Sequence, residues 1–334
     1  MSDVLLSVRD VKTYFFQDEG IVKAVDGATF DMLKGKTLGI VGESGCGKSV
    51  TTQSILRLVE KPGRIINGEI FLSQADGSVL DLLKLKADGP EMRSIRGGEI
   101  GLVFQEPMTS FSPVHTIGDQ IIEAIMLHKN VKKKEAREIG IEALRSVGIP
   151  KPDRRIDEYS FELSGGLRQR AMISVALSCK PRLLIADEPT TALDVTTQAQ
   201  ILDLLRKLQN ENNMAIMLIT HNLGVVAEMA DDVVVMYLGR VVEEGPVDDI
   251  FHNPLHPYTR ALLQSIPSID SQPRVKLPTI SGSIPHPYNR PGGCPFHPRC
   301  ESFKAGRCDL AEPALIQANE RQKVSCFLFE EGKS

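Results

Sequence analysis

The stretch that decides the fold is Gly42-Glu43-Ser44-Gly45-Cys46-Gly47-Lys48-Ser49. The apolar run 37–41 (TLGIV) before it is typical of a buried strand, and residues 48–59 after it are predicted to be a helix. Glycines let successive backbone N–H groups curl around phosphates, and a helix start adds partial positive charge. Lys48 supplies a full charge to the β- and γ-phosphates of a nucleotide, and Ser49 offers a hydroxyl group to Mg²⁺. The sequence therefore predicts a phosphate-binding loop between a strand and a helix.

A second predicted strand, residues 183–186, is followed by two carboxylates. Asp187 is placed to hold Mg²⁺ through water, and Glu188 to polarise a water molecule toward the γ-phosphate. A strand that ends in Asp-Glu is common and predicts little by itself. Together with the phosphate-binding loop upstream, it predicts the metal and base half of an ATPase.

Ser164-Gly165-Gly166 opens a predicted helix that runs to residue 178. A serine and two glycines at a helix start form a second anion site. Two such helix starts in one chain make sense if the second one serves the nucleotide of another subunit.

Strand and helix patterns alternate through the middle of the chain. Short apolar runs at 183–186 and 215–220 predict strands, with an amphipathic helix between them around residues 201–208. This order implies a parallel sheet with right-handed crossovers, and hence an α/β fold class. The segment from about 106 to 170 is predicted to be a helical insert that includes a helix at 132–147.

The end of the chain has a different character. Residues 233–238 and 240–244 predict a hairpin around Gly239. Prolines recur after residue 245, which forbids long helices and predicts a loop-rich appendage. We therefore predict an ATPase domain over residues 1–250 and an appendage over residues 251–334.

Bulk composition excludes some functions. The net charge of −4, the absence of Trp and an aromatic content of 5% argue against a nucleic-acid partner. No apolar run approaches the roughly 18 to 20 residues needed to span a bilayer, and the N-terminus lacks the pattern of a signal peptide. The expected location is the cytoplasmic face of the membrane, with attachment through partner subunits.

These motifs together resemble the ATP-binding subunits of ABC transporters over roughly residues 4–250. The resemblance implies the P-loop NTPase fold of an ABC nucleotide-binding domain with a helical subdomain. It implies that Glu188 is the catalytic glutamate, that Gln105 senses Mg²⁺ and contacts the transmembrane partner, and that His221 reaches the γ-phosphate. Ala192-Leu193-Asp194 matches the loop at the seam of the ATPase dimer.

The same resemblance implies a set of ligand-binding residues. Mg²⁺ is assigned to Ser49, Gln105 and Asp187. Phe15, or its neighbour Tyr14, falls where the family stacks an aromatic ring on adenine, although this aromatic cluster could equally be core. The full set assigned to ATP is Phe15, Gly42, Ser44, Gly45, Cys46, Gly47, Lys48, Ser49, Val50, Asp187, Ser164, Gly165, Gly166 and Asp194.

Two features indicate which branch of the ABC transporter family the chain resembles. The commonest signature has Gln where this chain has Leu167, and the Arg-Gln-Arg that follows at 168–170 is similar to the peptide-importer branch. The stretches 253–259 (NPLHPYT) and 293–300 (GCPFHPRC) resemble the tail of dipeptide and oligopeptide importers, which some nickel and glutathione importers share. The resemblance therefore implies an ATPase that powers import of dipeptides or oligopeptides.

Four of the six cysteines, Cys294, Cys300, Cys308 and Cys326, crowd the appendage. Their spacing contains no Cys-x-x-Cys pair, so the usual zinc-ribbon and ferredoxin patterns are absent. The resemblance implies a [4Fe–4S] cluster; a zinc ion and free thiols are the alternatives. Either metal would staple a segment that has little core of its own.

The implied partners are two membrane-spanning permease subunits, a second ATPase subunit and, indirectly, an extracytoplasmic substrate-binding protein. The peptide branch often pairs two different ATPases, which favours a heterodimer with a related chain. The rival interpretations are a soluble ABC-type ATPase of repair or translation, a kinase or GTPase, and a redox sensor or docking module based on the cysteine tail. The first two lack support because neither tandem ATPase units nor an Asn-Lys-x-Asp motif is present.

Overall fold

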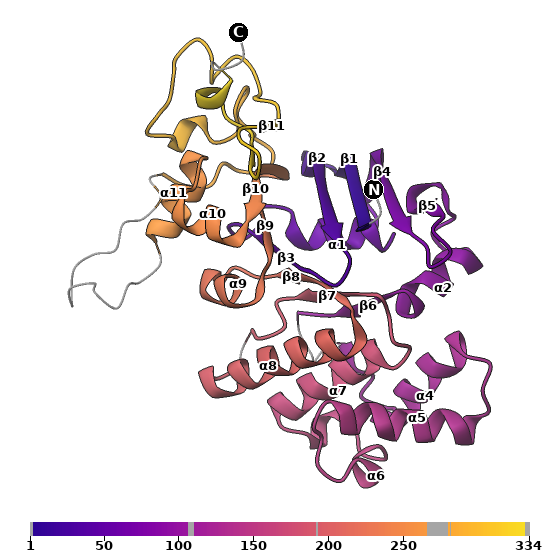
Figure 1. Cartoon of the computed structure of the whole chain (residues 1–334). Coiled ribbons are helices and arrows are strands. Elements are labelled where there is room, and N and C mark those ends of the chain that lie inside the picture. Colours follow the sequence, from indigo (N-terminus) through magenta and orange to yellow (C-terminus); the bar gives the residue numbers. More distant parts are fainter. Residues whose placement is uncertain (1–2, 106–109, 192, 266–279, 281, 331–334) are drawn as a thin grey trace. The chain divides into compact units, whose positions relative to one another are not determined.

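The computed structural model describes residues 3–105, 110–191, 193–265, 280 and 282–330 (Figure 1). Internal contacts divide the chain into two compact units. The first unit joins the residues up to Met32, Thr37–Lys84 and the residues from Thr220 onward. The second unit joins Leu33–Lys36 and Leu85–Ile219. Among the described residues, no helix is both long and apolar enough to cross a membrane.

An antiparallel sheet begins the first unit, with strand order β2-β1-β4-β5. Its strands are β1 (Val4–Gln17), β2 (Gly20–Leu33), β4 (Gly63–Ser73) and β5 (Val79–Asp81). Buried and more exposed residues largely alternate along β2, as expected for a strand with one face on a core.

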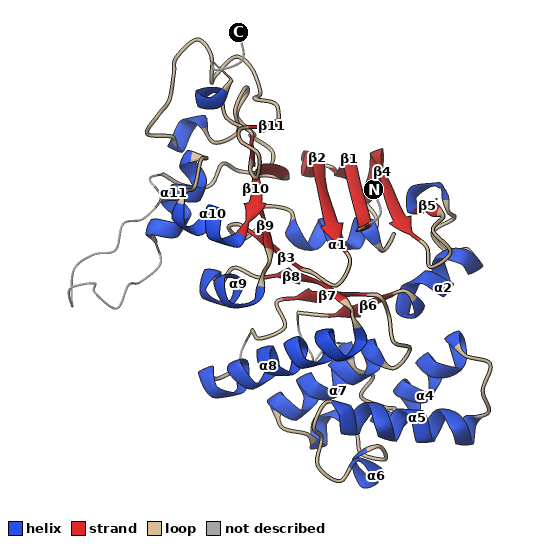
Figure 2. Ribbon diagram, viewed as in Figure 1, coloured by secondary structure: helices blue, strands red, loops and turns tan. Residues whose placement is uncertain are grey.

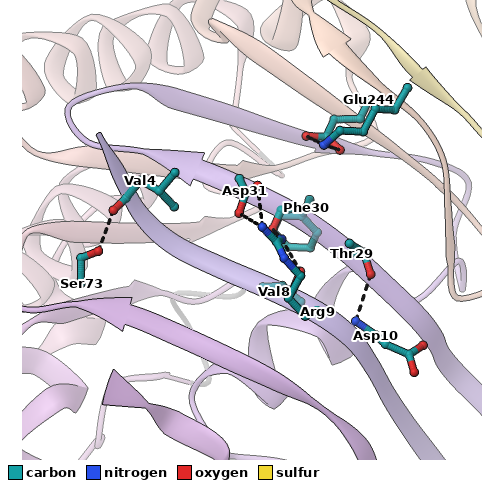
Figure 3. Close-up of polar contacts among 10 residues, drawn as sticks. Val4, Val8, Arg9, Asp10, Thr29, Phe30, Asp31, Ser73 and Glu244 are labelled. Carbon is teal, nitrogen blue, oxygen red and sulfur yellow. Dashed lines mark hydrogen bonds and ion pairs between the residues drawn. The ribbon is translucent and has the colours of Figure 1, made fainter. Parts of the chain in front are cut away.

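Polar contacts tie this sheet together (Figure 3). Arg9 on β1 donates to both carboxylate oxygens of Asp31 on β2, at 2.6 and 2.7 Å. The backbone N–H of Asp10 donates to the Thr29 hydroxyl at 2.9 Å, and the hydroxyl of Ser73 donates to the Val4 carbonyl at 2.7 Å. These contacts fix the register of β1 against both neighbours.

A second group of strands in the first unit leads into the phosphate-binding loop. β3 (Thr37–Val41) pairs in parallel with β9 (Asp232–Tyr237), which pairs antiparallel with β10 (Arg240–Pro246). The predicted hairpin is confirmed; its turn places Leu238 and Gly239 at φ 43° and 79°. Two short strands, β12 (Lys323–Val324) and β11 (Ile316–Gln317), continue this sheet from the C-terminal region.

The C-terminal region shares its core with the ATPase strands. Tyr258 and Phe296 are buried in one cluster with Val41 on β3 and Tyr237 on β9. The Tyr237 ring centroid lies 4.7 Å from that of Tyr258 and 5.3 Å from that of Phe296. Only short helices occur among the described residues here, as the prolines predict: α10 (Val247–His252), α11 (Pro257–Gln264), η3 (His297–Arg299) and η4 (Phe327–Phe329).

Two other helices of the first unit flank β3 and β9 in the sequence. α1 (Lys48–Ile55) follows the phosphate-binding loop, and α9 (Leu223–Met229) precedes β9. α1 ends before the predicted residue 59, because Arg57 adopts a positive φ of 55°.

The second unit contains a parallel sheet and a group of helices (Figure 2). β6 (Ile100–Val103), β7 (Leu183–Asp187) and β8 (Ala215–Ile219) pair in parallel, as the alternating pattern predicts. β7 and β8 are buried at every position, which explains their continuous apolar sequences. The helices are α2 (Pro90–Gly98), α4 (Ile117–His128), α5 (Lys133–Ser146), α6 (Pro152–Arg155), α7 (Gly165–Leu177) and α8 (Val195–Asn212).

Candidate nucleotide site

The phosphate-binding loop lies in the first unit, between β3 and α1. Gly42, Gly45 and Gly47 all have positive φ, at 150°, 77° and 102°. A Cβ atom on Gly42 would lie 2.2 Å from the carbonyl oxygen of Met236, and one on Gly47 would lie 2.2 Å from that of Ala24. Neighbouring backbone therefore excludes side chains at Gly42 and Gly47, whereas Gly45 faces open space.

Lys48 begins α1 and is buried. Its ammonium group donates to the Gly42 carbonyl at 2.8 Å and to the Glu43 carbonyl at 3.2 Å, so it lies inside the curve of the loop. Cys46 is also buried, and burial raises the pKa of its thiol. Ser49 and Val50 follow on α1 and are half-buried. The loop thus presents a fixed cation and a helix start to an anion.

Glu188 follows the buried strand β7 in the second unit. It has a positive φ of 47°, and its N–H donates to the Ile219 carbonyl at 2.8 Å. One carboxylate oxygen accepts hydrogen bonds from the side-chain amide of Gln105 at 3.2 Å and from the Thr191 hydroxyl at 2.8 Å. A strained backbone that holds a carboxylate in place is a common property of functional sites. Asp187, the last residue of β7, immediately precedes Glu188 and is buried.

The predicted signature lies at the start of α7, also in the second unit. Ser164 is the N-cap residue, and its side chain makes no capping hydrogen bond to α7. Gly166 approaches Thr197 closely, since a Cβ atom there would lie 2.8 Å from the threonine methyl group. Arg168 donates to the carbonyl oxygens of Ser160 and Leu163, which anchors the segment that leads into the signature.

Three further predicted residues have different surroundings. Asp194 caps α8 by accepting from the N–H of Thr197 at 3.0 Å and from its hydroxyl at 2.6 Å, and these bonds lower the pKa of Asp194. His221 is exposed on the segment between β8 and α9. Ala192 lies outside the described residues.

The structure separates the two aromatic candidates for adenine. The hydroxyl of Tyr14 donates to Asp26 at 2.5 Å, and Arg290 pairs with Asp26 at 2.9 Å. Burial and this hydrogen bond raise the pKa of Tyr14. Phe15 points to the opposite face of β1 and is half-buried near Gly63. Tyr14 is therefore held by Asp26, which also pairs with Arg290 of the C-terminal region, and Phe15 stays the predicted stacking ring.

The four C-terminal cysteines line a single cavity. It has an empty volume of about 370 Å³, counted with the open solvent at its mouth, and includes Cys294, Cys300, Cys308 and Cys326. Burial, together with the charges of the other three cysteines, raises the pKa of Cys294 to about 11. Among the described residues, no group of three His, Cys, Asp or Glu side chains lies close enough to hold a single metal ion.

Sequence reasoning missed three contacts. Arg299 pairs with Glu43 of the phosphate-binding loop, Thr191 donates to Glu188, and Tyr258 accepts from the N–H of Glu43. The Thr191 contact could have been inferred from its place three residues after Glu188. No local pattern predicts the other two contacts.

Comparison with known proteins identifies the family of the chain. The sequence model of the ABC transporter family matches residues 25–191, and that of the C-terminal region of oligopeptide/dipeptide transporters matches residues 242–308. The oligopeptide transport ATP-binding protein AppD of Bacillus subtilis is 51% identical, over 98% of this chain and 97% of its own length. The dipeptide transport ATP-binding protein DppD of Escherichia coli is 44% identical, over 96% of each chain.

Solved structures give the same result. A dimeric post-hydrolysis state of the ATP-binding cassette MJ0796, bound to ADP and Pi, has a TM-score of 0.64 and is 26% identical, over 73% of this chain and 99% of that one. A second dimeric structure of the MJ0796 cassette has a TM-score of 0.63.

The loop, the β7 carboxylates and the helix start at Ser164 define a P-loop ATPase of the ATP-binding-cassette class. The chain belongs to the ABC transporter family, and its C-terminal region belongs to the oligopeptide/dipeptide transporter group. The activity of the family is ATP hydrolysis coupled to transport.

Proposed function

We propose that this chain binds and hydrolyses ATP to power the import of dipeptides or oligopeptides through membrane-spanning partner subunits. The observation that carries the hydrolytic role is the fixed carboxylate of Glu188, held by Gln105 and Thr191 at the end of a buried strand. The peptide substrate is supported by the C-terminal match and by relatives named for oligopeptide and dipeptide transport.

The phosphate-binding loop binds the ATP phosphates. Its backbone N–H groups surround them, and Lys48 turns from the loop carbonyls to the β- and γ-phosphates. Ser49, Gln105 and Asp187 are the residues that would hold Mg²⁺, which neutralises charge that develops on the phosphates. Phe15 stacks on the adenine ring.

Glu188 acts as the general base or positions the attacking water. Gln105 and Thr191 keep its carboxylate in one orientation, so less reorganisation is needed in the transition state. His221 is assigned to the γ-phosphate. These roles follow from the motifs and are supported by the hydrogen bonds to Glu188.

A second ATPase subunit completes the mechanism. The helix start at Ser164, Gly165 and Gly166 binds the nucleotide of the facing subunit, and Asp194 lies at the dimer seam. The dimeric state of the MJ0796 cassette supports this arrangement. The proposed second subunit is a related chain, because the peptide branch often pairs two different ATPases, and both ATPases bind permease subunits at the cytoplasmic face of the membrane. An extracytoplasmic binding protein delivers the peptide.

Reconstitution tests the function. The chain is co-expressed with its permease subunits and second ATPase, and the purified complex is inserted into vesicles with the cognate binding protein. ATP-dependent uptake of a labelled dipeptide or oligopeptide, lost in the Lys48→Ala complex, is the expected result. Uptake of nickel or glutathione, without uptake of peptide, would show that the transported substrate is not a peptide. Failure to copurify with any permease would favour a non-transport ATPase.

The cysteines form a separate part of the proposal: Cys294, Cys300, Cys308 and Cys326 hold a [4Fe–4S] cluster. Support comes from the four side chains lining one cavity. A bound cluster would cross-link the proline-rich segment through four cysteine thiolates. No step of ATP hydrolysis would use it.

Metal analysis of protein purified without oxygen tests this assignment. A broad absorption band near ~400 nm with about four irons and four sulfides per chain is expected. Cys308→Ser should lose the band, whereas Cys179→Ser, on a cysteine of the second unit, should keep it. About one zinc without colour would make the site a structural zinc site. A metal-free protein would leave the residues as free thiols.

A further inference from the structure

The cysteine-bearing turn contacts the phosphate-binding loop directly. Arg299, whose side chain is only 4% exposed, donates to both carboxylate oxygens of Glu43, at 2.8 and 3.1 Å. Glu43 is the second residue of the loop, next to Gly42. A two-point contact between a guanidinium group and a carboxylate fixes both position and orientation. Arg299 therefore restrains the loop that receives the nucleotide.

The backbone of Glu43 is held from the same side. Its N–H donates to the hydroxyl of Tyr258 at 2.9 Å, and Tyr258 lies in the first turn of α11. The carbonyl oxygen of Glu43 in turn accepts from the N–H of Cys46 at 3.2 Å and from the ammonium group of Lys48 at 3.2 Å. A shift of Glu43 would therefore move the atoms that bind phosphate.

Arg299 lies in a turn that has its own backbone hydrogen bonds; we call residues 294–300 the cysteine turn. The carbonyl of Cys294 accepts from the N–H of His297 at 3.0 Å, and the N–H of Cys300 donates to the carbonyl of His297 at 3.3 Å. Phe296, within this turn, is buried against the aromatic cluster. Two cavity-lining cysteines and Arg299 therefore belong to one hydrogen-bonded turn.

We propose that Arg299 is a positioning residue for the phosphate-binding loop, and that the cysteine cavity is thereby coupled to nucleotide affinity. The proposal rests on the ATP-binding role of the loop but not on transport. Arg299 also compensates the negative charge of Glu43 on a loop that must accept a polyphosphate. Because coupling between two binding equilibria is reciprocal, nucleotide binding affects the cysteine turn in return.

Equilibrium binding of MgATP to the full chain tests the positioning role. Arg299→Gln leaves Glu43 charged and uncompensated, and we expect affinity to fall about tenfold. Adding Glu43→Gln to this variant removes the uncompensated charge but does not restore the two-point contact, so we expect only part of the affinity to return. Arg299→Lys keeps the charge without the two-point geometry and should bind with intermediate affinity. Arg321→Gln is the control, since Arg321 pairs with Asp249 at 3.1 Å and not with a residue of the loop.

A second experiment tests the coupling between the cysteine cavity and nucleotide affinity. Cys308 lines the cavity from outside the cysteine turn, so Cys308→Ser should weaken MgATP binding severalfold in the wild-type background. In the Arg299→Gln background it should have little further effect, because the connecting contact is already lost. Cys179→Ser controls for loss of a thiol.

The possible outcomes test the positioning role, the coupling and the proposed function separately. Unchanged affinity in a folded Arg299→Gln variant, with circular dichroism and thermal unfolding as the check, overturns the positioning role. If that variant does not fold, unchanged affinity in Arg299→Lys overturns the same role. Additive effects of Cys308→Ser and Arg299→Gln overturn the coupling. A wild-type chain that binds no MgATP contradicts the proposed function instead.

Discussion

The side-chain amide of Gln105 donates a hydrogen bond to the carboxylate of Glu188 at 3.2 Å, across 83 positions of sequence. Gln105 follows β6 and Glu188 follows β7, and these strands are parallel neighbours. Their carboxyl ends therefore meet at one edge of the sheet, where ligands bind in open α/β folds. The contact brings the residue assigned to Mg²⁺ and permease sensing together with the assigned base.

Glu188→Gln separates binding from hydrolysis. The substitution keeps the shape of the side chain but removes its charge, so it cannot act as a base. We expect steady-state ATPase activity to fall by roughly 10²- to 10⁴-fold, while MgATP affinity changes little. Phosphate release and equilibrium ATP binding are the two measurements. Glu211→Gln, an exposed change at the end of α8, should keep full activity, and substantial turnover by Glu188→Gln would remove the catalytic assignment.

Gln105→Ala should impair turnover less than the loss of Glu188. Thr191 still donates to the carboxylate, so its orientation is weakened and not lost. We expect kcat to fall about tenfold, with a higher Mg²⁺ concentration needed for half-maximal activity. A Thr191→Val variant tests the other hydrogen bond, and the double variant should lose more than either. An unchanged Mg²⁺ requirement in Gln105→Ala would leave Gln105 a structural contact only.

The glycines of the phosphate-binding loop should differ in their tolerance of alanine. A Cβ atom on Gly47 would lie 2.2 Å from the Ala24 carbonyl, whereas one on Gly45 meets nothing within 4 Å. Gly45→Ala should cost only about 1–2 kcal/mol of stability, from its positive φ of 77°, and weaken MgATP binding less than Gly47→Ala does. Gly47→Ala should distort the loop and abolish binding. Equal binding by the two variants would contradict this loop geometry.

Local patterns predicted the parts of this fold that depend on local interactions. β7 and β8 are continuous apolar runs because both their faces are buried, and the turn at Gly239 is marked by its glycine. The phosphate-binding loop is likewise recognisable, because its glycines are required by close backbone contacts.

The parts that escaped prediction depend on distant contacts. Arg299 and Glu43 are 256 positions apart, and neither has a local pattern that marks a partner. The C-terminal region was expected to be a loop-rich appendage because its prolines exclude long helices. Its aromatic residues Tyr258 and Phe296 nevertheless complete the core beneath β3 and β9, which composition does not indicate. The domain boundary at residue 250 stays a prediction.

His256 should make stability depend on pH. It is buried at the start of α11, where its Nδ1 accepts from the N–H of Tyr258 at 3.0 Å, and burial lowers its pKa to about 3. The unfolded chain, with a pKa near 6.5, binds more protons between these values. The contribution of His256 to the unfolding free energy is therefore retained above pH 6.5 and is lost as the pH drops below that value. The expected loss is about 2 kcal/mol between pH 7 and pH 5.

Variants isolate this contribution. His256→Asn can still accept from the N–H of Tyr258, so the helix start survives, but the titrating group is gone. Its unfolding free energy, measured with denaturant from pH 7.5 to 5, should fall less steeply than that of the wild type. Glu243 faces the backbone of His256 and Arg260 lies nearby, and both remain in the variant. His252→Asn, at an exposed position, should keep the wild-type slope. Parallel slopes for His256→Asn and the wild type would assign the acid sensitivity to other groups.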